Sequence, residues 1–314
     1  MDRNMNKVVL VTQKTRLQEL LYKYNTREQA KFHIEHMGAD FSDYIAEDEV
    51  YRRAVDAAKQ ISDKYARLTV IDKDFIPNML FGKDDVVVAL GRDGLVCNTM
   101  KYLDGQKLIG VNPDPCRWDG VLLPYEAKQL DEVLPKAFND NCDVKMVTMA
   151  KATTNDGQEM LAVNDFFIGP NSHISARYDI TTTNNEGRVV TEYQSSSGII
   201  VSTGIGQTGW YKSIIAQAKA SFEVFGYHCD KEYENIRWED KKLSYVVREP
   251  FPSNTTDVSI VFGTIKEGQP FKVLSKMSEK GVIFSDGMES DAIEFNAGIE
   301  VNIGIAEARG CLVR

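Results

Sequence analysis

Short apolar runs alternate with helix-length segments over the first third of the chain, and this alternation restricts the fold most. The runs are residues 7–11, 68–72, 86–90 and 107–111. Strands that are apolar on both faces and separated by helices are typical of a parallel sheet in an α/β domain. Ligands of such sheets bind beyond the carboxyl ends of the strands. Residues 91–94 and 112–115 follow two of the runs, so we expect a binding site there.

Two helices are predicted between the first two apolar runs. Thr26 and Gln29 have the spacing of a capping box, and Gly38 marks the end of that helix. Apolar residues then recur at helical spacing, which predicts an amphipathic helix from about Glu47 to Tyr65. Its apolar stripe requires a sheet to cover, which favours an N-terminal α/β domain.

Beyond about residue 140 the sequence changes to strand-sized runs separated by turns. These runs are residues 143–150, 172–183, 187–194, 243–249, 257–264, 271–275, 281–287 and 292–296. Regularly spaced short strands predict an antiparallel, β-rich second domain. One helix, from about Thr208 to Phe225, interrupts them. A chain of 314 residues is long enough for two such domains.

Composition excludes several classes of function. The net charge of -9 and the pI near 5.1 argue against a nucleic-acid partner. The five cysteines form no CxxC pair, and no histidine spacing suits zinc, so we expect no metal site built from protein ligands. No apolar run is long enough to span a membrane or to serve as a signal peptide. We therefore expect a cytoplasmic protein without a membrane partner.

Four short motifs suggest chemistry, and each also has a purely structural interpretation. Residues 204–209 read GIGQTG and satisfy GxGxxG, but no parallel strand follows their helix, so a Rossmann unit is disfavoured; the loop can still bind an anion. The turn at 91–94, GRDG, is either a phosphate turn or an ordinary tight turn. Asn164 and Asp165 either bind ligand hydroxyl groups or form an Asx turn. Asp286 and Gly287 first predict a hairpin turn.

Taken together, the order and spacing of these motifs resemble the NAD kinase family. That family usually has GGDG, then an NE pair, then a loop of the type STPTGSTAY, whereas this chain has GRDG, ND and STGIGQTGW (202–210). The segments IGVNPDPCRWDGVLLP (109–124) and SSGIIVSTGIGQTGW (196–210) are most similar to the branch that contains the mitochondrial type of NAD kinase and its bacterial relatives. The resemblance covers nearly the whole chain.

The resemblance implies an α/β domain followed by a β-rich domain. In this interpretation residues 1–138 form a nucleotide-binding domain joined by the C-terminal segment 292–314, and residues 139–291 form the substrate-binding domain. The implied reaction transfers the γ-phosphate of ATP to the 2′-hydroxyl of NAD, giving NADP, with Mg²⁺ or another divalent metal as counterion. The implied assembly is a homodimer or homotetramer.

The resemblance also assigns residues to roles. Asp93 matches the catalytic aspartate, which would accept or orient the hydroxyl proton. The positions that match the phosphate-binding walls are Gly91, Arg92, Gly94, Ser202, Thr203, Gly204 and Gly206. Those that match substrate contacts are Asn164, Asp165, Ser197, Thr208, Trp210 and Asp286.

This chain departs from the family pattern at three places. Ser197 stands where many bacterial members have aspartate, and Asp165 is one methylene shorter than the usual glutamate. Arg92 replaces a glycine, with Leu95 replacing a threonine; at a position that needs φ > 0 such a side chain would cost about 1–2 kcal/mol. Arg92 would either clamp a phosphate or exclude ATP and pair with Asp93. Two alternatives therefore stay open: a kinase of another nucleoside, sugar or lipid alcohol, and a catalytically silent sensor of NAD(P).

Overall fold

The structure, a computed structural model, describes residues 7–184, 186–227 and 235–314. It divides into two compact units, Met1–Lys145 with Gly310–Arg314, and Met146–Arg309. Two long strands carry the chain across this division: β6 (Val144–Thr154) and β17 (Glu300–Val313). β17 pairs with a strand of the second unit through Glu300–Asn302 and with a strand of the first unit through Cys311 and Leu312. Only its last residues, from Gly310 on, therefore belong to the first unit, whereas the predicted C-terminal segment was 292–314.

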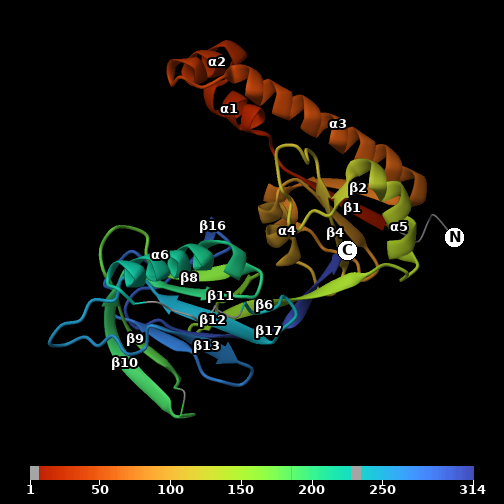
Figure 1. The fold of residues 1–314 in the computed structure, drawn as a ribbon. Helices are drawn as coiled ribbons and strands as arrows, with labels where there is room; N and C mark the ends of the chain where they lie inside the picture. Colours follow the sequence, from red (N-terminus) through yellow and green to blue (C-terminus); the bar gives the residue numbers. More distant parts are fainter. Residues whose placement is uncertain (1–6, 185, 228–234) are drawn as a thin grey trace. The chain divides into compact units, whose positions relative to one another are not determined.

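The first unit contains a parallel sheet in the order β2-β1-β3-β4, which the end of β17 and the short β5 extend (Figure 1). Its strands are β1 (Lys7–Thr12), β2 (Arg67–Asp72), β3 (Val86–Leu90), β4 (Lys107–Asn112) and β5 (Tyr125–Glu126). Its helices are α1 (Arg16–Tyr24), α2 (Arg27–His36), α3 (Phe41–Tyr65), α4 (Asp93–Met100) and α5 (Leu130–Phe138), with short 3₁₀ turns at Lys73–Asn78 and Ala127–Gln129.

Burial on both faces explains why the apolar runs form this sheet. All five residues of β3 are buried, and alternate residues of β1, β3 and β4 pack against α3 and α5. The helix α3 begins at Phe41 rather than at the predicted Glu47, because the Asp40 side chain caps it by accepting from the Ser42 N–H. Phe41, Tyr44 and Ile45 carry the apolar spacing into this first part of the helix. Figure 1 shows α1 and α2 beside the N-terminal part of α3, where these helices share a small core of their own.

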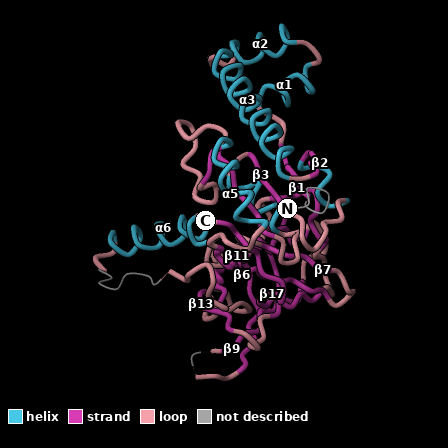
Figure 2. Tube along the Cα trace, turned by 90° about the vertical axis from the view of Figure 1, so that its right-hand side faces the viewer, coloured by secondary structure: helices cyan, strands magenta, loops and turns pink. Residues whose placement is uncertain are grey.

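The second unit contains two antiparallel sheets and one long helix. Figure 2 draws its strands in magenta and this helix in cyan. One sheet runs β13-β12-β11-β8-β15-β16, and the other contains β10-β9-β14-β17 with β6 and β7 alongside. The bounds are β7 (Glu159–Ala162), β8 (Asp165–Pro170), β9 (Ala176–Thr183), β10 (Val189–Ser196), β11 (Ile199–Ser202), β12 (Lys242–Val247), β13 (Phe262–Lys266), β14 (Lys272–Ser275), β15 (Gly281–Ser285) and β16 (Met288–Glu294), with a 3₁₀ turn at Gly206–Thr208 and helix α6 (Trp210–Val224).

The main apolar core of this unit draws residues from both sheets, among them Phe166, Tyr178 and Val273. The predicted fold class, an N-terminal α/β domain and a C-terminal β-rich domain, is thus confirmed. The predicted strand at 257–264 is correct only at its end, where β13 begins at Phe262. Before β13, the Glu192 carboxylate accepts from the N–H groups of Ser259 and Ile260. These N–H groups therefore bind a side chain instead of the backbone of a neighbouring strand. Over the described residues, no helix is long and apolar enough to cross a membrane.

Candidate functional site

The turn at residues 91–94 lies at the carboxyl end of β3 and leads directly into α4. Gly91 donates its N–H to the Val111 carbonyl at 3.1 Å, which joins the turn to the end of β4. Arg92 has φ -106° and ψ 167°, an extended conformation open to any residue, so the expected strain at this position is absent. The glycine usual in the family is therefore not required here by backbone geometry.

Asp93 is the first residue of α4, and its carboxylate holds a neighbouring loop. It accepts from the N–H of Leu122 at 2.8 Å and from that of Val121 at 3.2 Å. Arg314 donates to the Val121 carbonyl at 3.1 Å, so the same loop is held from its other side. A carboxylate has about four acceptor positions, and these two bonds leave others for a ligand. Asp93 is half-buried, so solvent and ligands can reach it.

Arg92 lies against a tryptophan and a glutamate. Its guanidinium carbon lies 4.0 Å from the centre of the Trp118 ring, and Nη2 donates to Glu47 Oε1 at 3.4 Å. The described contacts of Arg92 thus go to Glu47 and Trp118 and not to Asp93. An arginine that blocks the site would be expected to pair with Asp93. The structure pairs Arg92 with Glu47 instead.

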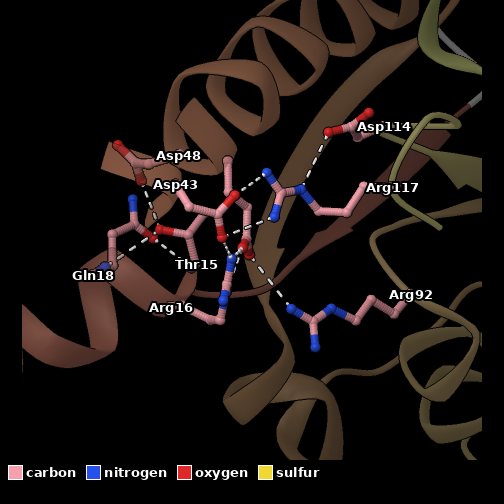
Figure 3. Close-up of polar contacts among 9 residues, drawn as sticks. Thr15, Arg16, Gln18, Asp43, Asp48, Arg92, Asp114 and Arg117 are labelled. Carbon is pink, nitrogen blue, oxygen red and sulfur yellow. Dashed lines mark hydrogen bonds and ion pairs between the residues drawn. The ribbon is translucent and has the colours of Figure 1, made fainter. Parts of the chain in front are cut away.

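Glu47 belongs to a network of ion pairs that links α1, α3 and the loop after β4 (Figure 3). Arg16 contacts both Glu47 and Asp43, and Arg117 donates to both oxygens of Asp43 at 2.7 and 3.1 Å. The hydrogen bonds from Arg117 and then Arg16 lower the pKa of Asp43 to about 2. Three guanidinium groups therefore converge on two carboxylates near the carboxyl ends of the strands.

Tyr51 of α3 fixes the strand ends around which this network forms. Its hydroxyl donates to the Leu90 carbonyl at 3.0 Å and accepts from the Gln13 N–H at 2.8 Å. These bonds join the last residue of β3 to the residue that follows β1. Burial raises the pKa of the Tyr51 phenol to about 12, so it remains a donor at neutral pH.

In the second unit, Asp286 organises the loop that contains Asn164 and Asp165. Asp286 and Gly287 both have positive φ, 55° and 72°, as the predicted hairpin turn between β15 and β16 requires. The Asp286 carboxylate accepts from the successive N–H groups of Val163, Asn164 and Asp165, at distances between 2.6 and 3.3 Å. The late SDG motif therefore has a definite structural role.

The glycine-rich loop after β11 packs against the same residues. Thr203 donates its N–H to the Asn164 carbonyl at 2.9 Å, and Ser202 pairs with Asp165 across the sheet. A Cβ atom on Gly206 would lie 2.0 Å from the Asn164 carbonyl oxygen, and one on Gly204 would lie 2.4 Å from another carbonyl oxygen. The two glycines are thus needed for close packing. Because β11 lies between antiparallel partners, the loop is not part of a Rossmann unit.

Asp165 is a buried carboxyl group with an unusual protonation equilibrium. Burial, followed by repulsion from Asp286, raises its pKa to about 7. Such a group exchanges its proton near neutral pH and can either donate or accept a hydrogen bond there.

Trp210 begins α6 and presents an aromatic surface. Its ring stacks on Phe167 of β8 with centroids 5.6 Å apart, and the Arg248 guanidinium lies 5.2 Å from its centre. The Trp210 residue is 37% exposed. Ser197 donates its N–H to the Arg248 carbonyl, which places Ser197 near this surface. Thr208 is exposed, and its hydroxyl donates to the Ile205 carbonyl.

The structure therefore forms two groups from the predicted residues. Gly91, Arg92, Asp93 and Gly94 share one turn of the first unit, and the contacts of the second unit connect Asn164 and Asp165 to the glycine-rich loop and Asp286. Comparison with known proteins identifies the fold that carries them. An NAD kinase from Archaeoglobus fulgidus in complex with ATP is similar over 99% of this chain and 94% of its own, with a TM-score of 0.57 and 14% identity. The chain has the fold of the NAD kinases.

Yeast NADH kinase complexed with NADH is similar to the same extent, with a TM-score of 0.58, 14% identity and coverage of 99% of this chain and 84% of its own. No protein-family model and no curated protein matches the sequence. The NAD kinase fold is therefore shown by structure rather than by sequence similarity.

Sequence reasoning missed three residues of these groups. The sequence predicts Glu47 only as the start of a helix, whereas the structure shows its carboxylate accepting from Arg92. Trp118 and Arg248 each stack with a predicted site residue. Glu47 precedes Arg92 by 45 positions and no short motif connects them, so only the fold could show that they meet.

Magnesium was expected from the resemblance. Among the residues that the structure describes, no three His, Cys, Asp or Glu side chains are grouped so as to hold a metal ion. Mg²⁺ commonly binds through one or two carboxylates together with substrate phosphates. The described side chains thus do not form such a metal site by themselves.

Proposed function

We propose that this protein is a small-molecule kinase that transfers the γ-phosphate of ATP to the 2′-hydroxyl of NAD. The observation that carries the proposal is the position of Asp93. In a chain with the NAD kinase fold, this half-buried carboxylate follows a fully buried parallel strand and begins a helix, beside backbone N–H groups suited to phosphate. The ATP and NADH bound by the two similar kinases support nucleotides as ligands.

The proposed chemistry requires positioning more than covalent catalysis. The oxygen of the 2′-hydroxyl forms a bond to the γ-phosphorus while the bond between that phosphorus and the β,γ-bridging oxygen breaks. ADP leaves with the bond's electrons, and Asp93 accepts the hydroxyl proton. The two N–H groups that already bind the Asp93 carboxylate fix its orientation without using all its acceptor positions.

The second unit supplies the proposed contacts with NAD. Asn164 and Asp165 would bind ribose hydroxyl groups from the loop that Asp286 holds in place. Trp210, already stacked on Phe167, would provide a flat apolar surface for the adenine ring. Ser197 and Thr208 would contribute polar contacts at its edge. Ser202, Thr203, Gly204 and Gly206 would form the loop beside the phosphates.

The decisive experiment incubates the purified chain with ATP, MgCl₂ and NAD and measures NADP with an NADP-specific dehydrogenase. We expect NADP from the unaltered chain and a fall in kcat of about 10²–10⁴-fold for Asp93→Asn, the range expected for the loss of a general base. Asn retains an oxygen that can accept from Leu122, so thermal unfolding should show an intact fold. Undiminished activity of Asp93→Asn would exclude Asp93 as the base.

The same assay separates the alternatives. Phosphorylation of another nucleoside, sugar or lipid alcohol, but not of NAD, would support the kinase activity and identify a different acceptor. A chain that binds NAD without forming any product would be a sensor. Gain of activity in Arg92→Gly would show that the arginine blocks transfer, whereas the pairing of Arg92 with Glu47 leads us to expect no such gain.

Three finer assignments belong to the same proposal. The similarity of residues 109–124 and 196–210 supports the branch with the mitochondrial type of NAD kinase. We propose a homodimer or homotetramer, which light scattering would detect, and a cytoplasmic location, which fractionation would test. NAD and NADH should be compared as acceptors, because one of the similar kinases is an NADH kinase.

A further inference from the structure

Arg92 is held more loosely than the other arginines of its network. Its hydrogen bond to Glu47 measures 3.4 Å, whereas Arg16 and Arg117 bind Asp43 at 2.8 and 2.7 Å. The Arg92 side chain is 43% exposed, against 11% for Glu47. A guanidinium has five N–H donors, and the structure gives Arg92 one hydrogen bond of marginal length. Arg92 therefore has donors to offer to a ligand.

Trp118 fixes the plane of that guanidinium without using its donors. The stacking distance of 4.0 Å covers one face of the group and leaves its edges open. The Trp118 carbonyl accepts from the Asn112 side chain at 2.9 Å, so the tryptophan is itself anchored to the end of β4. A guanidinium with a fixed plane and open edges is suited to the bidentate binding of phosphate oxygens.

The Glu47 carboxylate is the anionic partner of Arg92 in this structure. Its carboxylate is also bound by Arg16 from α1, so it remains charge-compensated when Arg92 leaves. Releasing Arg92 thus does not leave the buried Glu47 carboxylate without a cation, a loss that would otherwise oppose the exchange. The network provides a resting partner for Arg92 that a stronger anion can replace.

We infer that Arg92 is the residue that binds the phosphoanhydride chain of the phosphoryl donor, and that Glu47 holds it in place until the donor arrives. The inference rests on the proposed kinase function for the donor's role, but the binding itself requires no catalysis. The ligand chemistry is a chain of linked phosphates, whether as ATP or as inorganic polyphosphate. The arginine that replaces the family's glycine would thus determine specificity for the phosphoryl donor.

The test measures binding of inorganic tripolyphosphate, ATP and AMP to the full chain by calorimetry, without NAD. We expect Arg92→Ala to weaken the binding of tripolyphosphate and ATP by about 10-fold or more, because charge-assisted hydrogen bonds to the linked phosphates are lost. The binding of AMP should weaken much less. Arg92→Lys should bind at an intermediate strength. Arg53→Ala removes an exposed arginine from α3 and should bind like the unaltered chain.

Glu47→Gln tests the second half of the inference. Removing the negative charge that competes for Arg92 should increase the affinity for tripolyphosphate by about 2- to 5-fold, the range for a partly exposed ion pair. Asp43→Asn is the matched control, because Asp43 lies one turn away on α3 and also pairs with Arg16, but not with Arg92. In an Arg92→Ala background the gain from Glu47→Gln should vanish.

The results separate this inference from the kinase proposal. Equal affinity of Arg92→Ala and the unaltered chain for tripolyphosphate would overturn the inference even if NADP is made. Loss of affinity in Arg92→Ala would support it even if no NADP is made. Equal tightening by Glu47→Gln and Asp43→Asn would mean that general charge, and not release of Arg92, governs binding, which would overturn the role of Glu47. If ATP is weakened but tripolyphosphate is not, the arginine recognises the nucleoside and the inference fails.

Discussion

At the scale of single residues, Asp165 makes the clearest prediction about pH. Its pKa is raised to about 7 in the folded protein, above the ordinary value of 3.8 that it has when unfolded. Between these values the unfolded chain releases the proton and the folded chain keeps it, so this residue lowers stability as pH rises from about 4 to 7. Asp165→Asn should therefore stabilise the protein at pH 8 by roughly 2–4 kcal/mol and by little near pH 4.

Urea unfolding of both chains at pH 4, 6 and 8 checks this difference. A matched control is Asp179→Asn, since Asp179 lies on β9 and pairs with Lys276 at 3.0 Å. That change should not stabilise the protein at pH 8. A stability gain for Asp165→Asn that is the same at every pH would show that folding does not raise the pKa of Asp165, contrary to the prediction.

The sequence could supply the identity of these residues but not their partners. Asp93 and the Asn164–Asp165 pair could be proposed from the sequence, because each lies in a short local motif next to a strand. The backbone conformation of Arg92 could not be predicted, because a glycine in related sequences does not prove positive φ. The contact between Arg92 and Glu47 depends on how α3 crosses the strand ends, which no local pattern encodes.

At the scale of elements, the hairpin between β15 and β16 supports a loop far away in the chain. The Asp286–Gly287 turn was predicted from its two residues, but its three bonds to residues 163–165 span more than a hundred positions. Asp286→Ala should destabilise the protein by about 2–3 kcal/mol, because three buried or half-buried N–H groups lose a charged acceptor and alanine fits positive φ poorly.

Asp286→Asn is the conservative partner of that variant. Asparagine tolerates the left-handed conformation and retains an acceptor, so the loss should be about 1 kcal/mol. Thermal unfolding and NAD titration of both variants would test the link, since a loosened 163–165 loop should weaken NAD in the same order. Normal NAD affinity in a destabilised Asp286→Ala would separate the turn from the substrate site.

Elements were predicted best where burial alone determines them. The runs at 7–11 and 86–90 form β1 and β3 because both faces are covered, a property visible in composition. Helix α1 was missed, although Thr15 and Gln18 form a full capping box there. The Thr15 hydroxyl also donates to Asp48 at 2.6 Å, a tertiary bond that fixes the helix start and that local spacing does not reveal.

At the scale of the whole molecule, the two units have separate cores. One apolar cluster contains residues of β1, β3, β4, α3 and α5, and another joins the two antiparallel sheets. Chains with independent cores commonly unfold in more than one step. We therefore expect two calorimetric transitions, and Leu134→Ala, which opens a cavity in the first unit only, should lower one of them by an amount equivalent to about 2–5 kcal/mol.

Ligands should then act on different transitions. NAD at 100 times its Kd should stabilise the transition that Leu134→Ala leaves unchanged by about 2.7 kcal/mol, because its proposed contacts lie in the second unit. Tripolyphosphate should instead raise the transition that Leu134→Ala lowers, because Arg92 belongs to the first unit. Differential scanning calorimetry of both chains with each ligand measures all four shifts. If NAD raised only the first unit's transition, Asn164, Asp165 and Trp210 would not be its principal contacts, and the assignment of NAD to the second unit would have to be abandoned.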